Sequence, residues 1–518
     1  MIKTLLKVKK EKLVIWLIVA IYLTLHLISL TNLPVFADES IYIRWAQLII
    51  DDWQQYLFFA LNDGKTPIFV WLLVPFQFIF TDPLFAGRIV SVITGLVQLF
   101  VMKSIAKELN LEKKYQWLCM LFTALSPFWF FHHQLAIMDG LLTLFLSLSV
   151  LQVLKLIKLN QANSTKNTAL FFTITLAGFF LGLAILTKIP ALLFVPSLLI
   201  LAFIFPQKHP QKSSLKQIIK VMNQIIGVIA VGLVLFLSLK LHPAFGQLFS
   251  RGNDFLFSWQ EIVFDQKWQV TIPSWPNYLS YFWHYLTWPI LIFSLIGIFS
   301  KERRKVIVLN LGWIFFALPI FLLGRVIYPR YLFPVSIFIT LAALFGIKVL
   351  INKNVLLKTL TLIMITISLW QSLNFIYPLV SNIEQTPFVP ADREQYLTEW
   401  SAGFGIKETV DLIQKKSQDK NVLVLSEGYF GTLPDGLLMY LHREDVTNLF
   451  VIGIGQPISR IDSSYKTMAQ EYDQILLVGN SHRLKIDLSQ AELTLEACRP
   501  FSAPCHQVWD ITFLIKKS

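Results

Sequence analysis

Apolar runs of about 20 residues recur along this chain and constrain its fold more strongly than any other feature. A helix of that length spans the roughly 30 Å hydrocarbon core of a bilayer. Charged residues make up only 15% of the chain, against roughly 25% in soluble globular proteins. The sequence therefore predicts a mainly α-helical polytopic membrane protein. We place eleven spans at 13–33, 84–105, 115–131, 140–157, 169–187, 190–206, 217–241, 278–299, 306–323, 331–350 and 359–376.

The basic residues indicate how these spans are oriented. Six alternate connections hold about half of the 45 Lys and Arg residues, from Lys3 in the first connection to Lys358 in the last. Short loops rich in lysine and arginine remain in the cytoplasm, so we expect these segments to face inward. The segment 66–80 is short and carries prolines, which predicts a re-entrant or juxtamembrane helix that does not cross. Eleven crossings then place the C-terminus outside the cytoplasm.

This layout predicts two domains. Residues 1–376 form a transmembrane domain whose first span remains as an anchor, because no small-residue cleavage site follows it. Its first extracytoplasmic loop, 34–83, contains "SIYIRWAQLIIDDWQQYLFFALNDGK", in which apolar and polar residues alternate with a helical period. Such helices lie in the membrane interface, so we expect juxtamembrane helices here. Residues 377–518 are expected to form an extracytoplasmic domain.

The tail from about residue 377 reads as a small α/β domain. "GIKETVDLIQKKSQDKNVLVLSEG" predicts an amphipathic helix, a turn and a buried strand. "NLFVIGI", "QILLVGN" and "VWDITFLI" predict further strands. Cys498 and Cys505 lie on either side of "RPFSAP". The sequence leaves open whether they form a disulfide or remain free thiols.

The net charge of +13 does not indicate nucleic-acid binding. The basic residues occur in short clusters between apolar runs, without the basic groove and stacking aromatics that such binding uses. The three cysteines show no metal-binding spacing. The sequence therefore predicts membrane lipids, and no nucleic acid, among the partners of the chain.

Adjacent carboxylates, Asp38 and Glu39, follow the first span in "LPVFADESIYIRWAQLI". A third acid, Asp139, begins the span 140–157 on the same predicted outer side. A carboxylate at a helix start can be a simple cap, and a loop carboxylate can be merely solvated. Three acids at one membrane face favour instead a general base and a second acid that orients a nucleophile or a metal.

Basic side chains are expected on the same side of the membrane. Lys65 lies in "GKTPIFVWL", Arg88 in "PLFAGRIVSVITG", and Arg325 and Arg330 in "GRVIYPRYLFPV". A charge inside a span costs a few kcal/mol, so it is usually paired or functional. Snorkelling to the interface is the alternative for Lys65 and Arg325. Arginine and lysine together suit an anionic leaving group such as phosphate at headgroup depth.

Several of these segments occur in an order that resembles the GT-C glycosyltransferases. They are most similar to glycosyltransferase family 39, which includes the protein O-mannosyltransferases and the lipid A aminoarabinose transferase. The ordered set covers roughly residues 10–380: "ADESIYIRWAQLI", "GKTPIFVWLL", "FAGRIVSVITG", "IMDGLLTLF", "LGLAILTKIPALLF" and "YPRYLFPV". The resemblance implies a GT-C membrane enzyme of the cell envelope. Its donor would be a polyprenyl-phosphate-linked sugar and its acceptor a protein, lipid or glycan outside the cytoplasm.

The resemblance implies roles for the acids and for Lys65. Asp38 matches the family's catalytic acid, Glu39 its neighbour, and Asp139 the second acid. Lys65 matches the lysine of a "KPP" segment that contacts the lipid phosphate, although this chain reads "GKTP" there. In the aminoarabinose transferase an acid at the position of Gly64 helps to hold a metal, so the resemblance leaves a divalent metal open.

The resemblance places further residues near the donor phosphate. Arg330 and Tyr331 match an "RY" pair near the site, and Arg88 matches the arginine of an "RLPS"-like segment, here "GRIVS". Gln134 departs from the pattern, in which arginine is common. The aromatic-rich loop 242–277 adds two further candidates, Arg251 and Asp254.

The expected reaction is a single inverting displacement at the anomeric carbon of the sugar. A partly desolvated carboxylate takes the acceptor's proton, and basic side chains stabilise the leaving phosphate. Three alternatives stay open: a transporter or lipid flippase, an envelope ligase or polymerase using the same lipid donors, and a structural membrane protein. A transporter predicts internal repeats and charges near mid-membrane, and the sequence shows neither.

Overall fold

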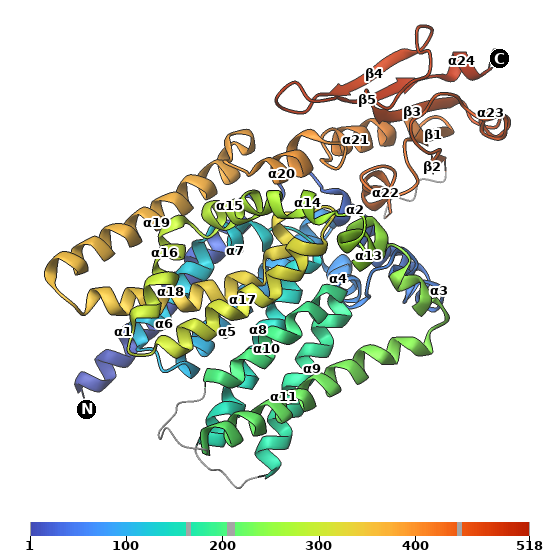
Figure 1. Cartoon of the computed structure of the whole chain (residues 1–518). Coiled ribbons are helices and arrows are strands. Elements are labelled where there is room, and N and C mark those ends of the chain that lie inside the picture. The colour runs from blue at the N-terminus through green and yellow to red at the C-terminus, as the bar shows by residue number, and fades with distance from the viewer. Residues whose placement is uncertain (1, 162–166, 205–212, 443–447, 517–518) are drawn as a thin grey trace. The chain divides into compact units, whose positions relative to one another are not determined.

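The computed structural model describes residues 2–161, 167–204, 213–442 and 448–516 (Figure 1). The chain forms two compact units, and each is built from segments far apart in the sequence. The first comprises Met1–Ile28, Phe58–Phe69 and Ser91–Ser381; the second comprises Ser29–Leu57, Val70–Val90 and Asn382–Ser518. The segment that carries Asp38 and Glu39 therefore belongs to the same unit as the tail.

The first unit is helical. Its longer helices are α1 (Ile2–Leu27), α5 (Pro83–Glu108, whose first turns belong to the second unit), α6 (Lys113–Leu125), α8 (Met138–Gln161), α9 (Asn167–Thr187), α11 (Ser213–Leu237), α15 (Trp275–Tyr285), α17 (Arg303–Leu323), α18 (Val335–Ile351) and α19 (Val355–Ser381). Its shorter helices include η1 (Phe59–Asp63), α7 (Pro127–His132), η2 (Ile189–Phe194), α10 (Val195–Ile200), η3 (Leu201–Ile204), η5 (Pro243–Phe249), α12 (Gly252–Phe255), α13 (Trp259–Val263), α14 (Trp268–Thr271), α16 (Trp288–Ile296) and η8 (Pro329–Leu332).

Among the described residues, six helices are long and apolar enough to cross a membrane, or seven if one bent pair counts as a span. The six are Pro83–Glu108, Met138–Gln161, Asn167–Thr187, Leu215–Leu241, Arg303–Leu323 and Val355–Ser381. The bent pair, Trp268–Tyr285 and Trp288–Phe299, turns by 100° and includes the predicted span 278–299.

The first predicted span, 13–33, falls in the continuous helix α1, which ends earlier, at Leu27. The other three are shorter or interrupted helices. The predicted spans 190–206 and 331–350 correspond to shorter apolar helices, and 115–131 is divided between α6 and α7. Prolines lie at or beside three of the breaks, at Pro127, Pro190 and Pro289. Proline lacks the N–H that a helix interior requires, which explains why long apolar runs form broken helices.

Close helix packing characterises the middle of this unit. Every residue of α18 from Val335 to Ile347 is buried, where the helix packs against α16 and α17. A Cβ added at Gly178 of α9 would lie 2.5 Å from the Cβ of Val231 in α11. Side chains do not approach so closely, so glycine lets these two helices meet almost backbone to backbone, as small residues do in membranes.

The second unit contains the predicted α/β tail. Its helices are α2 (Ala37–Asp51), α3 (Trp53–Tyr56), most of α4 (Ile68–Ile79), α20 (Pro390–Arg393), the π-helical turn η10 (Glu394–Thr398), α21 (Ile406–Ser417), α22 (Asp435–Leu441), α23 (Ser463–Ala469) and α24 (Thr512–Lys516). Its strands are β1 (Val422–Ser426), β2 (Leu449–Gly453), β3 (Gln474–Asn480), β4 (Glu492–Ala497) and β5 (His506–Asp510). They form one sheet in the order β2-β1-β3-β5-β4. β1 is parallel to β2 and β3, whereas β5 is antiparallel to β3 and β4.

The structure confirms most of the elements predicted for this region. The amphipathic helix is α21, the buried strand after it is β1, and the next two predicted strands are β2 and β3. The segment "VWDITFLI" is a strand only as far as Asp510. There the Asp510 carboxylate accepts hydrogen bonds from the backbone N and Oγ1 of Thr512 and begins α24. Cys498 and Cys505 form a disulfide, which settles the pairing that the sequence left open.

Candidate active site

The first unit gathers one acid, two basic side chains and a tyrosine where α8 and η8 begin and α9 ends. Asp139 lies in the first turn of α8 and is buried. Its Oδ1 is 2.6 Å from Nζ of Lys188, the residue that follows α9. Lys188 Nζ lies 4.8 Å from the ring centroid of Tyr331, and the guanidinium carbon of Arg330 lies 5.5 Å from the same centroid. We call these four residues the Asp139 cluster.

The Asp139 carboxylate is an ion-pair partner and not only a residue at a helix start. A buried carboxylate needs a cation and hydrogen bonds to compensate its lost hydration, and Lys188 provides the cation. The cluster also brings an ammonium and a guanidinium group together, and both bind phosphate oxygens. Sequence reasoning did not select Lys188. The signal was available, because "ILTKIPALL" places a lysine within an apolar stretch.

Lys65 lies in a second group of the same unit. It follows η1, and its Nζ is 5.6 Å from the ring centroid of Phe255 in the loop 242–277. Arg251 faces the same ring at 5.7 Å and pairs with Asp63 and Asp254. The aromatic-rich loop therefore packs on the Lys65 segment. Arg251 and Asp254 form ion pairs there that hold the loop.

In the second unit, Glu39 and Arg88 form a buried ion pair with exposed fractions of 0% and 1%. The Arg88 guanidinium donates from Nε and Nη2 to the two carboxylate oxygens of Glu39, at 2.8 and 2.7 Å. It also donates to the carbonyl oxygens of Leu30 and Leu33, both at 2.8 Å, and of Pro34 at 3.1 Å. A guanidinium has five N–H donors. All five are therefore used, which leaves none for a donor phosphate.

Asp38 and Glu39 occupy different environments although they are neighbours. Both lie in the first turn of α2. Asp38 is half-buried, whereas Glu39 is fully buried, and Glu39 Oε2 accepts a hydrogen bond from the backbone N of Phe36 at 3.0 Å. Consecutive helical residues point in directions roughly 100° apart, so only one of the two carboxylates can face Arg88. Asp38 is therefore the more exposed carboxylate of the two.

The start of α2 is anchored on the tail. Four hydrogen bonds join it to main-chain atoms there: Ala37 N to Ser401 O (3.0 Å), Gly403 N to Val35 O (2.8 Å), Ser40 Oγ to Gly431 O (2.9 Å) and Gln47 Nε2 to Met439 O (2.8 Å). Arg499, in the loop closed by the disulfide, in turn donates to the carbonyl oxygen of Ala402 at 3.0 and 3.1 Å. The tail thus fixes where the backbone of Asp38 lies within this unit.

One titratable group next to this anchor has a shifted pKa. Asp435 lies in the first turn of α22, and its burial raises the pKa of the carboxyl to about 6. The backbone N of Gly431, which donates to Asp435 Oδ2 at 2.7 Å, and the positive charge of Arg44 in α2 oppose this rise. The packing of α22 on α2 therefore includes a carboxyl group that titrates near neutral pH.

A resident metal finds no suitable ligand set among the described residues. One group of side chains there is close enough to hold an ion, Glu496 with Cys498 and Cys505, but the two sulfurs form a disulfide and offer no thiolate. The carboxylates of Asp139 and Glu39 each pair with a cationic side chain, with which a metal ion would compete. These residues therefore do not fit a resident divalent metal.

The structure places the predicted residues in three groups. Asp139, Arg330 and Tyr331 lie together with Lys188; Lys65 lies with Arg251 and Asp254; and Asp38, Glu39 and Arg88 lie in the second unit. Arg325 belongs to none of these groups. It pairs with Glu261 at 2.5 Å and its guanidinium carbon lies 4.6 Å from the ring centroid of Phe257, as expected of a residue that holds a loop.

Comparison with known proteins agrees with the sequence resemblance. Residues 52–248 match the family described as dolichyl-phosphate-mannose-protein mannosyltransferase. No curated protein matches the sequence. In fold, the chain is similar to ArnT from Cupriavidus metallidurans bound to undecaprenyl phosphate, with a TM-score of 0.60 and 14% identity over 95% of this chain and 97% of that one.

A second group of solved structures shares the fold. The oligosaccharyltransferase of Archaeoglobus fulgidus tethered with an acceptor peptide gives a TM-score of 0.53 at 10% identity, over 91% of this chain and 69% of that one. The same organism's AglB with an inhibitory peptide and a dolichol-phosphate gives 0.50 at 12% identity, with the same coverage. The expected GT-C fold of a multi-pass membrane protein is thereby confirmed.

Proposed function

We propose that this protein is a membrane glycosyltransferase that transfers a hexosyl or pentosyl unit from a polyprenyl-phosphate donor to an acceptor outside the cytoplasm. The observation that carries the proposal is the Asp139 cluster, in which a buried carboxylate, two cations and a tyrosine meet at helix ends. The fold supports it, because similar structures are those of ArnT with undecaprenyl phosphate and of AglB with a dolichol-phosphate.

The proposed roles follow from chemistry and burial. Asp38 takes the proton from the acceptor's nucleophilic group, because it is half-buried, more exposed than Glu39, and matches the catalytic acid of the family that the sequence resembles. Lys65 and Arg330 stabilise the negative charge that develops on the leaving phosphate. Bond formation to the acceptor and cleavage of the bond to phosphate occur in one displacement, which inverts the anomeric carbon.

Asp139 and Glu39 support the reacting groups in this proposal. Asp139 holds the ammonium group of Lys188 against Tyr331. Glu39, together with Arg88, fixes the first turn of α2. We therefore place Glu39 and Arg88 in positioning roles, and Asp38 and Lys65 in contact with substrate.

The tail is proposed to lie outside the cytoplasm. The charge distribution predicts this side, and the Cys498–Cys505 disulfide supports it, because disulfides persist in oxidising compartments. We keep 1–376 as the catalytic membrane domain and 377–518 as an extracytoplasmic domain, which anchors α2 and so acts on the reaction through Asp38.

Replacement of Asp38 tests the proposal. In cells that produce Asp38→Asn, mass spectrometry of envelope lipids, proteins and glycans should show the loss of one sugar adduct and accumulation of the polyprenyl-phosphate sugar. The level and thermal unfolding of the variant should match the wild type. Asp51→Asn, at the exposed end of the same helix, is the matched control and should retain the adduct.

Two outcomes would contradict the assignment. Full sugar transfer by Asp38→Asn would exclude Asp38 as the base. An unchanged set of sugar adducts when the whole gene product is absent would exclude transfer itself. A transporter is the alternative, and substrate uptake into sealed vesicles without a covalent product would favour it.

A further inference from the structure

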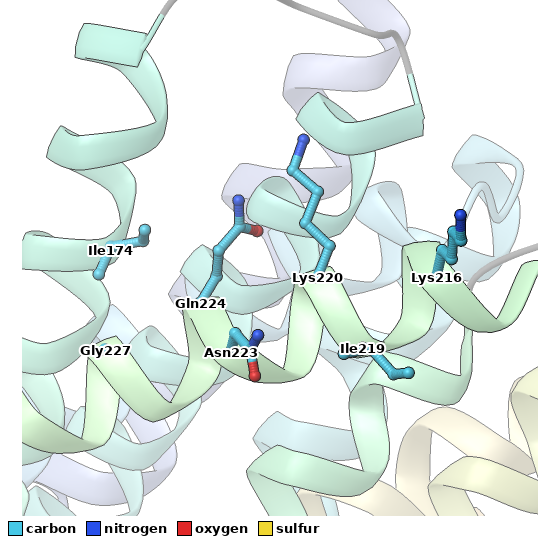
Figure 2. A pocket seen from close by; sticks show the side chains of 7 residues that line it. All are labelled: Ile174, Lys216, Ile219, Lys220, Asn223, Gln224 and Gly227. Carbon is cyan, nitrogen blue, oxygen red and sulfur yellow. The ribbon is translucent and has the colours of Figure 1, made fainter. Parts of the chain in front are cut away.

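A hollow of about 550 Å³ lies between α11 and the first half of α9, whereas Lys188 follows the other end of α9 (Figure 2). Its volume is within the range of sites that bind small molecules. Four polar residues of α11 line it, namely Lys216, Lys220, Asn223 and Gln224, together with Ile219 and Gly227 of α11 and Ile174 of α9. No carboxylate is among the described residues that line the hollow.

The hollow arises from how the two helices pack. Gly178 and Val231 face each other at the close contact described above, and Ile174 lies one turn earlier, with Cγ2 at 3.5 Å from a Cβ built on Gly227. If this pairing of α9 and α11 is continued toward their first residues, Asn167, the first residue of α9, lies roughly level with Lys220 of α11. α11 begins earlier, at residue 213, so its first turns extend past the first residue of α9.

The charged lining residues lie toward the start of this stretch of α11. From Lys216 to Gly227 the helix advances roughly 16 Å, at 1.5 Å per residue. The two lysines come first, with the apolar Ile219 between them, the two amides follow, and Gly227 comes last, next to Ile174 of α9. The headgroup layer of a leaflet is roughly 5–8 Å thick. The hollow therefore matches an amphiphile with an anionic head and an apolar chain.

The polar side chains offer donors in this hollow. Lys216 and Lys220 are one helical turn apart and both are exposed, and Figure 2 shows Lys220 and Gln224 extending from the same side of α11. Gln224 Oε1 accepts a hydrogen bond from Nδ2 of Asn160 at 2.8 Å, which leaves its NH₂ group as the donor. Two ammonium groups and an amide NH₂ thus line the space, and such donors bind phosphate oxygens.

We propose that this hollow binds an anionic membrane phospholipid. Its phosphate would contact Lys216 and Lys220, its glycerol region the two amides, and one acyl chain Ile174 and Gly227. The charge distribution predicts that this end of α9 and α11 faces the cytoplasm, where basic segments attract anionic lipids. The inference does not rest on the proposed glycosyltransferase function.

Lipid retention by the full-length protein tests the inference. The protein in detergent is mixed with phosphatidylglycerol or with phosphatidylcholine of the same acyl chains, and bound lipid is counted by native mass spectrometry. We expect preferential retention of phosphatidylglycerol. Lys216→Gln/Lys220→Gln should weaken its apparent affinity roughly 30-fold, because each lysine near an anionic lipid contributes roughly fivefold. Phosphatidylcholine retention should not change.

A second variant probes the apolar part of the site. Gly227→Leu should displace the acyl chain and reduce phosphatidylglycerol retention while both lysines remain, since a Cβ at Gly227 has ordinary contact distances. Glycerol phosphate, which carries the charge without the chains, should not compete. Lys353→Gln/Lys358→Gln, at two exposed lysines elsewhere, is the matched control and should bind like the wild type.

Three results would overturn the inference. The first is equal retention of phosphatidylglycerol and phosphatidylcholine by the wild type. The second is an unchanged phosphatidylglycerol affinity in the lysine double variant. The third is competition by glycerol phosphate as strong as that by phosphatidylglycerol, which would indicate a site for a soluble anion instead.

Discussion

Replacing Arg88 by lysine separates a structural role of the Glu39–Arg88 pair from a role in binding the donor. The guanidinium donates five hydrogen bonds to buried acceptors, whereas an ammonium group has three N–H donors. At least two acceptors therefore lose their partner in Arg88→Lys. We expect the free energy of unfolding to fall, although the positive charge beside Glu39 is kept.

The size of the effect follows from these contacts. A buried acceptor without a partner costs about 1–3 kcal/mol, so two of them cost about 2–6 kcal/mol. Domains are typically stable by about 5–15 kcal/mol, so the loss is large. Arg88→Met leaves the buried Glu39 carboxylate without its cation, which should lower the free energy of unfolding by about 3–5 kcal/mol. In Glu39→Gln/Arg88→Met the losses should be less than additive, because both changes break the same pair.

Thermal unfolding of the purified full-length protein measures these differences. Arg325→Lys is the matched control, because Arg325 also pairs with a glutamate but is about one-third exposed; its replacement should cost less than about 1 kcal/mol. The reasoning is refuted if Arg88→Lys unfolds like the wild type and instead raises the KM for the lipid donor. That pattern would show that Arg88 binds phosphate.

Two further predictions concern Lys188 and Asp435. Lys188→Met should reduce sugar transfer by about 10²–10³-fold, because the Asp139 cluster would lose one of its two cations, and the loss of one group that stabilises developing charge has an effect of that size. Lys305→Met should retain activity in the same assay, because Lys305 is equally exposed but pairs with Glu302 in a connection predicted to be cytoplasmic. Asp435→Asn should raise stability at pH 7.5 by up to about 3 kcal/mol, because the folded pKa of about 6 exceeds the ordinary 3.8 and the native state favours the protonated form. The stability difference from the wild type should be absent below about pH 4, grow between about pH 4 and pH 6, and be nearly complete above pH 6. An equal difference in unfolding midpoint at pH 7.5 and below about pH 4 would contradict it.

The sequence predicts the membrane region well because hydropathy alone decides which segments avoid water. It does not reveal where an apolar run bends, as at Pro289, because the packing that satisfies the freed backbone groups is tertiary. β4 escaped prediction for a related reason. It lies at the edge of the sheet, where Leu493 is exposed and Leu495 is only partly buried, so its apolar residues are few and its signal is weak.

In the candidate site, too, the sequence predicts some features, whereas others depend on tertiary contacts. The motif "ADES" indicates two acids at a membrane edge, but which of them is buried depends on Arg88, 49 residues away. The pairing of Asp139 with Lys188 also spans 49 residues, and no local pattern connects them. Sequence thus identifies the chemical groups, whereas the long-range ion pairs that distinguish a reacting acid from a supporting one require the fold.

Four of the bonds that hold α2 on the tail have one property in common. On the tail side these four use a peptide group: the carbonyls of Ser401, Gly431 and Met439 and the amide of Gly403. Arg44 and Asp51 of α2 contact a tail side chain instead, that of His442. Substitutions at most of these positions would leave such bonds intact, while an insertion or deletion nearby would shift the helix. At these four positions the amino-acid identity can therefore change while α2 stays in place, provided that the course of the tail's loops is kept.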